Sequence, residues 1–380
     1  MNRHMTPNDI NDITISLFGE ADEAMPSLEN DLERLYQSLY STLAHHRAYG
    51  GLQPSVNTYV ARKNGRPLAI LLLRREKDTV RVLNEQIRLD EEELSRFARY
   101  IFDTFDDVNV IVLHAVEVRL QRLDFPCQQF HCTEDIVLDL PDSTDAYRGS
   151  LGKSTRSYIQ RYQNKLRRDF PGMHYAVHAG EEIDEAQVRS IIELNRARMA
   201  DKNRTSYIDD LEAERIVHFA RRYGLMSVMS IDGRVCAGAI SFRIGDNYFL
   251  KVIAHDPAYN DYRLGTLCCY LTICECIARG GKEYHFLWGR YEYKYRLLGV
   301  QRDLDHVTLY RSHLQMGLNG RQALGNACKG TVLRARSWVL QRARDNDRLG
   351  MVLKSVLSGL QGAKSRMKTA ISSLKQSRSA

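Results

Sequence analysis

The sequence predicts a mixed α/β protein in which two similarly built domains follow each other and precede a basic helical tail. Residues 60–69 and 228–237 share Val, Gly, Arg and Ala at one constant offset, and both segments lie in the same order of predicted elements. The strong positive charge of the C-terminal segment separates the tail from both domains. We therefore expect domains at 1–145 and 146–310 and a tail at 311–380.

Each shared segment predicts a β-hairpin, because Asn64-Gly65 and Asp232-Gly233 each separate two apolar runs and favour tight antiparallel turns. The order helix, helix, hairpin, strand, helix, strand occurs twice, which favours duplication over chance similarity. The polar, turn-rich stretch 141–150 is the expected junction. The expected elements are 29–46, 57–63, 67–75, 80–84, 90–105 and 109–114 in the first repeat, and 184–200, 210–223, 225–231, 235–243, 248–254, 265–279 and 283–288 in the second.

Length and composition indicate a globular chain, since 380 residues with 43% apolar content can fill two cores. No apolar run has the length of a signal peptide or a membrane span, so we expect a cytoplasmic protein. The eight cysteines form no C-x-x-C pair and are expected to be reduced thiols. Four of them share the expected helix 265–279, where burial in the core is favoured over a metal site. We expect no metal.

The tail carries most of the positive charge: residues 311–380 hold 14 Lys and Arg against two acids, whereas the first 310 residues hold 40 against 45. Apolar residues in the tail recur at the spacing of an amphipathic helix; they are Leu349, Leu353, Val356, Leu360, Ala363, Met367, Ile371 and Leu374. Such a helix could lie on an anionic membrane surface or pack against protein, and packing is slightly favoured. Nucleic acid is disfavoured, because the basic residues lack interleaved aromatics other than Trp338.

A candidate phosphate-binding loop follows the strand 248–254. The loop ends in Arg263-Leu-Gly265-Thr266 and opens a helix, whose free N–H groups and dipole favour an anion. Arg263 adds a cation beside it. The corresponding loop of the first repeat, 84–91, has no Gly and several acids, so we expect no phosphate there. An ordinary loop is the alternative interpretation of 255–266.

This order of motifs resembles the GNAT acyltransferases, specifically the branch linked to cellulose and exopolysaccharide biosynthesis, which is similar to FemAB-type double-GNAT transferases. The resemblance is carried by Asp256-Pro-x-Tyr259, by Arg263-x-Gly265-Thr266, and by Gly289-x-x-x-Tyr293-Lys294 after the strand 283–288. It is best over 150–310, weaker over 30–140 and absent from the tail. The phosphate loop departs from the family, because it lacks the fuller Gly-x-Gly of typical GNATs.

The resemblance implies an enzyme that moves an acyl group from acetyl-CoA or another acyl-CoA to an amine or hydroxyl. The implied acceptor is an amino sugar, a sugar nucleotide or a polysaccharide or cell-envelope precursor, near the inner membrane surface. Arg263, Gly265 and Thr266 would hold the pyrophosphate, and N–H groups of the strand 248–254 would face the carbonyl. Glu292 is the expected base and Tyr293 the expected acid. Lys294 would hold an anionic substrate or the phosphates.

Further residues are candidates for the acceptor. Arg156 belongs to a basic helix starting near residue 151, which could meet a diphosphate or be a solvated face; Arg161, Lys165 and Arg168 share one side of it. Asn195 and Lys251 are expected to point into the cleft between the domains. We assign no chemical role to His45, His46 and His255.

Two other functions stay open. One is a FemAB-like transferase that uses aminoacyl-tRNA, which the net negative body disfavours. The other is a non-catalytic GNAT-like regulator of exopolysaccharide synthesis. The oligomeric state is left open.

Overall fold

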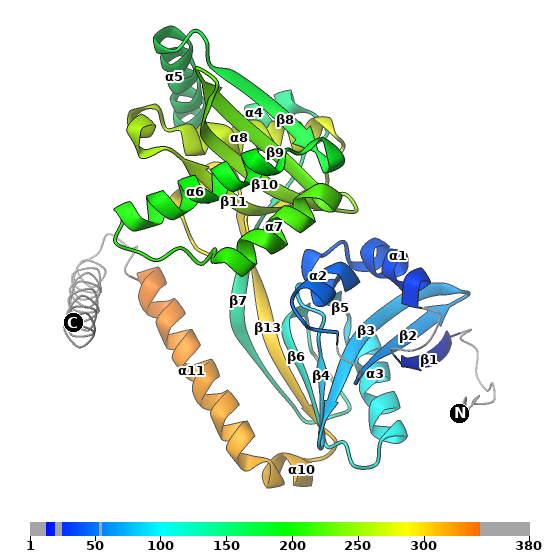
Figure 1. The fold of residues 1–380 in the computed structure, drawn as a ribbon. Helices are drawn as coiled ribbons and strands as arrows, with labels where there is room; N and C mark the ends of the chain where they lie inside the picture. The colour runs from blue at the N-terminus through cyan, green and yellow to red at the C-terminus, as the bar shows by residue number, and fades with distance from the viewer. Residues whose placement is uncertain (1–12, 20–24, 53–54, 343–380) are drawn as a thin grey trace, which may run out of the picture.

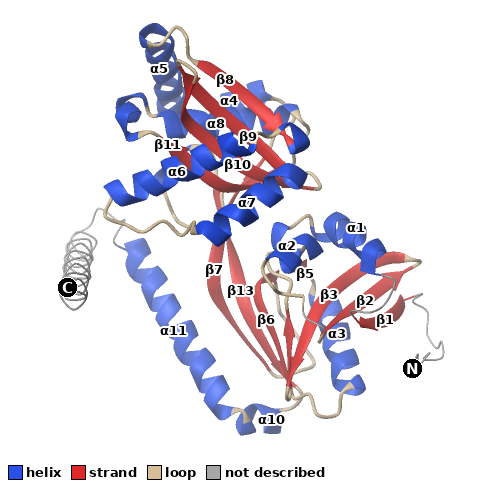
Figure 2. Ribbon diagram, in the orientation of Figure 1, coloured by secondary structure: helices blue, strands red, loops and turns tan. Residues whose placement is uncertain are grey.

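The computed structural model describes residues 13–19, 25–52 and 55–342, and it shows a mixed α/β fold built around one 13-stranded sheet (Figure 1). The strand order is β1-β2-β3-β4-β6-β13-β7-β12-β11-β10-β9-β8, with β5 paired to β6. The sheet extends through two lobes of the protein (Figure 2). The N-terminal lobe consists of β1 (Ile13–Gly19), α1 (Met25–Tyr36), α2 (Leu43–Ala48), β2 (Val56–Lys63), β3 (Arg66–Glu76), β4 (Thr79–Val82), β5 (Arg88–Leu89), α3 (Glu91–Thr104) and β6 (Val110–Val118).

The C-terminal lobe repeats this order after an additional pair of helices. It consists of α4 (Thr144–Ser150), α5 (Lys153–Asp169), β8 (His174–Ala179), α6 (Glu185–Asp201), α7 (Asp210–Tyr223), β9 (Gly224–Ile231), β10 (Arg234–Ile244), β11 (Asn247–His255), α8 (Leu264–Ala278), β12 (Glu283–His285) and α9 (Glu292–Arg296). The predicted order of helices, hairpin, strand, helix and strand is therefore present twice.

Both predicted hairpins are confirmed, with the same backbone at both turns. Asn64 and Gly65 join β2 to β3 at φ 51° and 76°, and Asp232 and Gly233 join β9 to β10 at φ 51° and 76°. Positive φ at both central residues is the requirement of a type I′ turn, which Asn-Gly and Asp-Gly meet at the least steric cost.

Two long strands connect the lobes. β7 (Cys127–Asp139) and β13 (Val300–Tyr310) pair antiparallel with each other. β7, which follows the N-terminal lobe in sequence, also pairs with β12, whereas β13, which follows the C-terminal lobe, pairs with β6. The strand that follows each lobe in the sequence thus pairs with a strand of the other lobe. The domain boundaries at 145 and 310 stay a prediction, and the strand exchange shows that these segments do not form two separate sheets.

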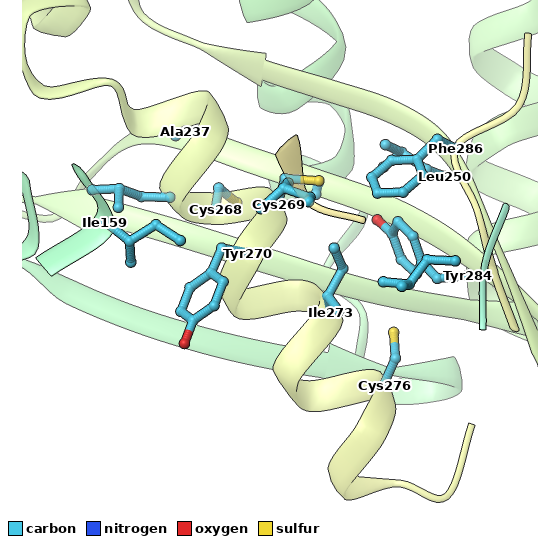
Figure 3. Close-up of a cluster of buried hydrophobic side chains, with 14 of the residues drawn as sticks. Ile159, Ala237, Leu250, Cys268, Cys269, Tyr270, Ile273, Cys276, Tyr284 and Phe286 are labelled. Carbon is cyan, nitrogen blue, oxygen red and sulfur yellow. The ribbon is translucent and has the colours of Figure 1, made fainter. Parts of the chain in front are cut away.

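Helices cover both faces of the C-terminal half of the sheet. On one face, α5 and α8 bury a core that includes Cys268, Cys269 and Cys276 (Figure 3). On the other face, α6 and α7 pack against Phe249 and its neighbours. The predicted core role of the α8 cysteines is confirmed for these three, while Cys274 is partly buried.

The sequence pattern missed several elements. The expected helix 29–46 is divided, because Gln37 has a positive φ of 45° and ends α1 before a short 3₁₀ turn and α2. The expected junction 141–150 contains α4, which Ser143 caps by accepting from the Ala146 N–H. β1, β7, β8 and β13 were not predicted; β7 and β13 carry several charged residues, and the apolar runs of β7 and β8 are only three residues long.

The first part of the predicted tail is helical and packs on the protein body. α10 (His313–Leu318) and α11 (Gly320–Arg342) follow β13, and α11 runs beside β7 (Figure 1). Asn326 on α11 donates to Thr308 Oγ1 on β13 at 3.0 Å. The amphipathic stripe 349–374 lies outside the described residues. No described helix is long and apolar enough to span a membrane.

Candidate active site

The two central strands of the C-terminal lobe separate after a short parallel pairing. β11 and β12 pair over Asn247–Phe249 and Glu283–His285, and beyond this point the chain after β12 follows β7 instead. β11 continues to His255 with a bulge opposite β10, which leaves Lys251 outside the ladder. Beyond this pairing, the edge of β11 that faces away from β10 has no strand partner among the described residues. We call this feature the strand separation.

The loop after β11 forms a short 3₁₀ segment and then opens α8. Arg263 adopts φ 54° at the N-cap of α8, and its side chain makes no capping hydrogen bond. The Thr266 N–H donates a hydrogen bond to the Arg263 carbonyl. The N–H groups of Leu264 and Gly265 precede the first intrahelical hydrogen bonds. An added Cβ at Gly265 would lie 2.9 Å from His255 Nδ1, so this glycine also permits close packing against β11.

α5 covers the start of α8. Lys165 lies over the Tyr262 ring, and the Tyr158 and Tyr162 hydroxyls interact with Thr266 and Arg263. The start of α5 is also free of a side-chain cap, because Gly152 occupies its N-cap. Two uncapped helix starts thus border one cavity of about 380 Å³, which we call the donor cavity. Its lining comprises Ser154, Thr155, Ser157, Tyr158, Arg161, Thr266, Glu292, Tyr293, Arg296 and Leu297.

The structure brings Thr266, Glu292 and Tyr293 together in this cavity, with Arg263 beside it. Glu292 is 78% exposed and pairs with Arg296 at 2.8 Å. Glu292 therefore faces solvent, and its role as the base stays a prediction. Tyr293 is largely enclosed, and burial followed by the charge of the Cys269 thiol raises the pKa of its hydroxyl far above the ordinary value. Such a phenol stays protonated at neutral pH and can donate a hydrogen bond, but it is a weaker acid than an ordinary tyrosine.

Lys294 lies inside the protein rather than in the cavity. It is 2% exposed, and its ammonium donates to the carbonyls of Phe286, Leu287 and Trp288 at 2.8, 2.9 and 2.6 Å. Burial lowers its pKa to about 8, while the charge of Asp135 opposes this shift. All three N–H groups hold the chain that follows β12, so the geometry does not support the predicted contact of Lys294 with an anionic substrate.

The remaining predicted residues are dispersed. Arg156 donates to the carbonyls of Gly149 and Leu151 and thereby joins α5 to α4. Asn195 is buried on α6 and accepts from Ser206 at 3.0 Å. Neither residue lines the donor cavity.

Lys251 lies between the lobes, as predicted. Its ammonium is 2.6 Å from the Glu212 carboxylate, which also accepts from the Tyr49 hydroxyl of the N-terminal lobe at 2.8 Å. This arrangement ties α2 to β11 and α7.

A basic groove runs along α5 beside the donor cavity. It measures about 940 Å³, is open to solvent and contains no acidic residue in its lining. The lining comprises Arg148, Arg156, Ser157, Gln160, Arg161, Asn164, Lys165 and Arg168. The predicted side formed by Arg161, Lys165 and Arg168 is therefore present.

His255 is a candidate that sequence reasoning missed. It ends β11 next to the start of α8, and its Nε2 lies 3.0 Å from Asn260 Oδ1. Burial lowers the pKa of His255, although the Asn260 contact opposes this. The imidazole is then neutral, and donation from Nε2 to the Asn260 oxygen leaves Nδ1 unprotonated. The Asn five positions after a strand-terminal His was the available signal.

Comparison with known proteins supports the same part of the chain. Residues 153–295 match the family model of an acetyltransferase (GNAT) domain. No curated protein matches the chain. A crystal structure of FemX is similar over 77% of this chain and 97% of that chain, with a TM-score of 0.58 and 8% identity.

Two further structures show weaker likeness. The structure of L-PGS from Bacillus licheniformis covers 78% of this chain and 94% of that chain, with a TM-score of 0.46 and 11% identity. A tandem GNAT protein from the clavulanic acid biosynthesis pathway covers 78% and 98%, with a TM-score of 0.36 and 13% identity. At these identities structural likeness indicates the fold alone. The strand separation, the start of α8 and most of the lining of the donor cavity lie within residues 153–295, the segment that matches a GNAT acetyltransferase domain.

Proposed function

We propose that the chain is an acyltransferase that takes its acyl group from acetyl-CoA or another acyl-CoA. The observation that carries this proposal is the donor cavity, where the uncapped starts of α5 and α8 meet Arg161, Arg296 and several hydroxyl groups. Helix starts without caps offer N–H donors and positive dipole ends to phosphate. Arg263 adds a guanidinium next to Thr266. We retain as acceptor an amino sugar, a sugar nucleotide or a polysaccharide precursor, because the function predicted from sequence specifies that class.

In the proposed reaction, the acceptor amine or hydroxyl attacks the thioester carbonyl, and the C–S bond breaks as the new C–N or C–O bond forms. Backbone N–H groups of β11 at the strand separation would stabilise the oxyanion. Tyr293 would protonate the leaving thiolate. Glu292 is one candidate for the base that takes the acceptor proton, and the neutral His255 is a second one with better shielding from solvent.

An aminoacyl-tRNA donor is the second candidate, and the basic groove favours it. Its five Lys and Arg side chains, without an acid, offer a continuous surface to a polyanion that is longer than CoA. In this case an ester carbonyl would replace the thioester at the same strand separation. A non-catalytic regulator is the third candidate, which binding without turnover would indicate.

Calorimetric titration with acetyl-CoA, a longer acyl-CoA and an aminoacyl-tRNA tests the proposal. We expect micromolar binding of an acyl-CoA that weakens at least tenfold in Arg161→Ala and in Arg263→Ala. Arg167→Ala, an exposed position of the same helix that does not line the cavity, is the matched control and should bind like the wild type. If neither acyl-CoA binds while aminoacyl-tRNA does, the CoA proposal is wrong and the second candidate replaces it.

A further inference from the structure

A second cavity lies at the seam where the exchanged strands meet. It measures about 380 Å³, and we call it the seam cavity. Its walls come from the α1–α2 connection, the loop before α3, and β6, β7, β11, β12 and β13. It shares no lining residue with the donor cavity. Both lobes and both exchanged strands therefore contribute to one cavity that the proposed donor chemistry does not use.

The deep wall of the seam cavity carries hydrogen-bond acceptors without partners. Asp135 is 2% exposed; its Oδ2 lies 2.6 Å from His285 Nδ1, while its Oδ1 is buried and has no hydrogen bond among the described residues. The buried Oε1 of Gln86 likewise lacks a partner within the described part of the chain. A buried acceptor left unpaired costs about 1–3 kcal/mol. Because Asp135 and Gln86 both line the seam cavity, their two unpaired oxygens indicate a ligand that donates hydrogen bonds.

The charges near Asp135 are already balanced. His285 is 6% exposed between Asp135 and Glu283, and Arg302 donates to Glu283 at 2.9 Å. A second full cation is therefore not required at the deep wall, and neutral donors such as hydroxyl or amine groups suffice.

The rim of the cavity has the opposite character. Lys282 is exposed there and forms no ion pair among the described residues, and Arg88, which also lines the cavity, pairs with Glu117 at 3.1 Å. A ligand that spans the cavity thus contacts hydrogen-bond acceptors at the deep wall and cations at the rim. This order fits a molecule with hydroxyl or amine donors at one end and a phosphate at the other.

We propose that the seam cavity binds a small sugar phosphate, with its hydroxyl or amine groups on Asp135 Oδ1 and Gln86 Oε1 and its phosphate at Lys282 and Arg88. The cavity volume of about 380 Å³ suits one phosphorylated hexose. This site is separate from the donor cavity, and its occupancy can be measured without any acyl donor. The cavity exists only in the folded chain, where both lobes form its walls. Binding therefore also stabilises the folded chain by mass action.

Titration of the full chain with glucose 6-phosphate, glucosamine 6-phosphate and inorganic phosphate tests this proposal. We expect at least one sugar phosphate to bind more tightly than inorganic phosphate and to raise the melting temperature. Gln86→Leu should weaken that binding about threefold to tenfold, the loss of one hydrogen bond. Lys282→Ala should weaken it too, whereas Lys63→Ala, an exposed lysine of β2, should not.

The two sugar phosphates distinguish the possible ligands. Tighter binding of glucosamine 6-phosphate identifies an amino sugar, and equal binding identifies hydroxyl donors as sufficient. Equal affinity for inorganic phosphate would overturn the proposal, because the deep wall would then contribute nothing. The absence of binding by all three probes at millimolar concentration would overturn it too. Melting curves of each variant establish that a loss of binding is not a loss of folding.

Discussion

Replacing Lys294 with Met should lower the free energy of unfolding by about 2–4 kcal/mol, because buried carbonyls lose the ammonium that donates to them. The change leaves the carbonyls of Phe286 and Trp288 without the Lys294 ammonium as donor, while the Leu287 carbonyl still accepts from the Ile136 N–H at 3.4 Å; each unsatisfied carbonyl costs about 1–3 kcal/mol. Met also removes the desolvation cost of a buried ammonium, which offsets part of this loss. The net effect therefore falls below the sum of three lost hydrogen bonds.

Urea unfolding monitored by circular dichroism measures this change, and Trp288 fluorescence reports on the same segment because its carbonyl is one of the three acceptors. Lys282→Met, at an exposed position on the same stretch of chain, is the matched control and should change stability by less than about 0.5 kcal/mol. Wild-type stability in the Lys294→Met variant, combined with loss of transfer activity, would refute the structural role and restore the role predicted from sequence.

Two further predictions concern packing and pH. Gly238→Ala should destabilise the chain by about 1–3 kcal/mol, because the new Cβ would lie 2.3 Å from Ile191 Cδ1, whereas Gly149→Ala, with no atom within 4 Å, should not; melting curves compare them. The pKa of His285 is raised above its ordinary value of 6.5, since its hydrogen bonds to Asp135 and Glu283 outweigh burial, which lowers it. The stabilisation is present below about pH 6.5 and declines as pH rises through the folded-state pKa, so the stability difference between wild type and Asp135→Asn should shrink with increasing pH. A difference that grows with pH would contradict this assignment.

Local signals predicted much of the fold. The two hairpins were predictable because Asn-Gly and Asp-Gly specify their turns without help from the rest of the chain. The start of α8 was also predictable from local sequence, because a loop that ends in Arg263-Leu-Gly265-Thr266 precedes an apolar run. The exchange of β7 and β13 was not, because their pairing joins residues far apart in sequence, and strands exposed to both lobes lack the clean alternation of a half-buried strand.

The candidate site was predictable in position but not in the state of its side chains. Thr266, Tyr293 and Arg263 meet where the motif placed them. The motif could not indicate that Lys294 turns inward, because a basic residue after an aromatic pattern has the same spacing whether it faces solvent or three carbonyls. It also could not indicate that α5 covers α8, since the contact between Lys165 and Tyr262 depends on tertiary packing.

The two lobes differ at the helix starts that occupy corresponding places in the fold. α3 and α8 occupy corresponding places in the two lobes, yet their starts differ. Asp90 caps α3 by accepting from the Glu93 N–H, and Glu91, Glu92 and Glu93 fill its first turn. The start of α8 has neither a side-chain cap nor an acid in its first turn. An anion at α3 would have to displace a carboxylate that is already bonded, whereas an anion at α8 meets free N–H groups. The first repeat therefore keeps the architecture of the second while its own side chains occupy the position that a phosphate would need.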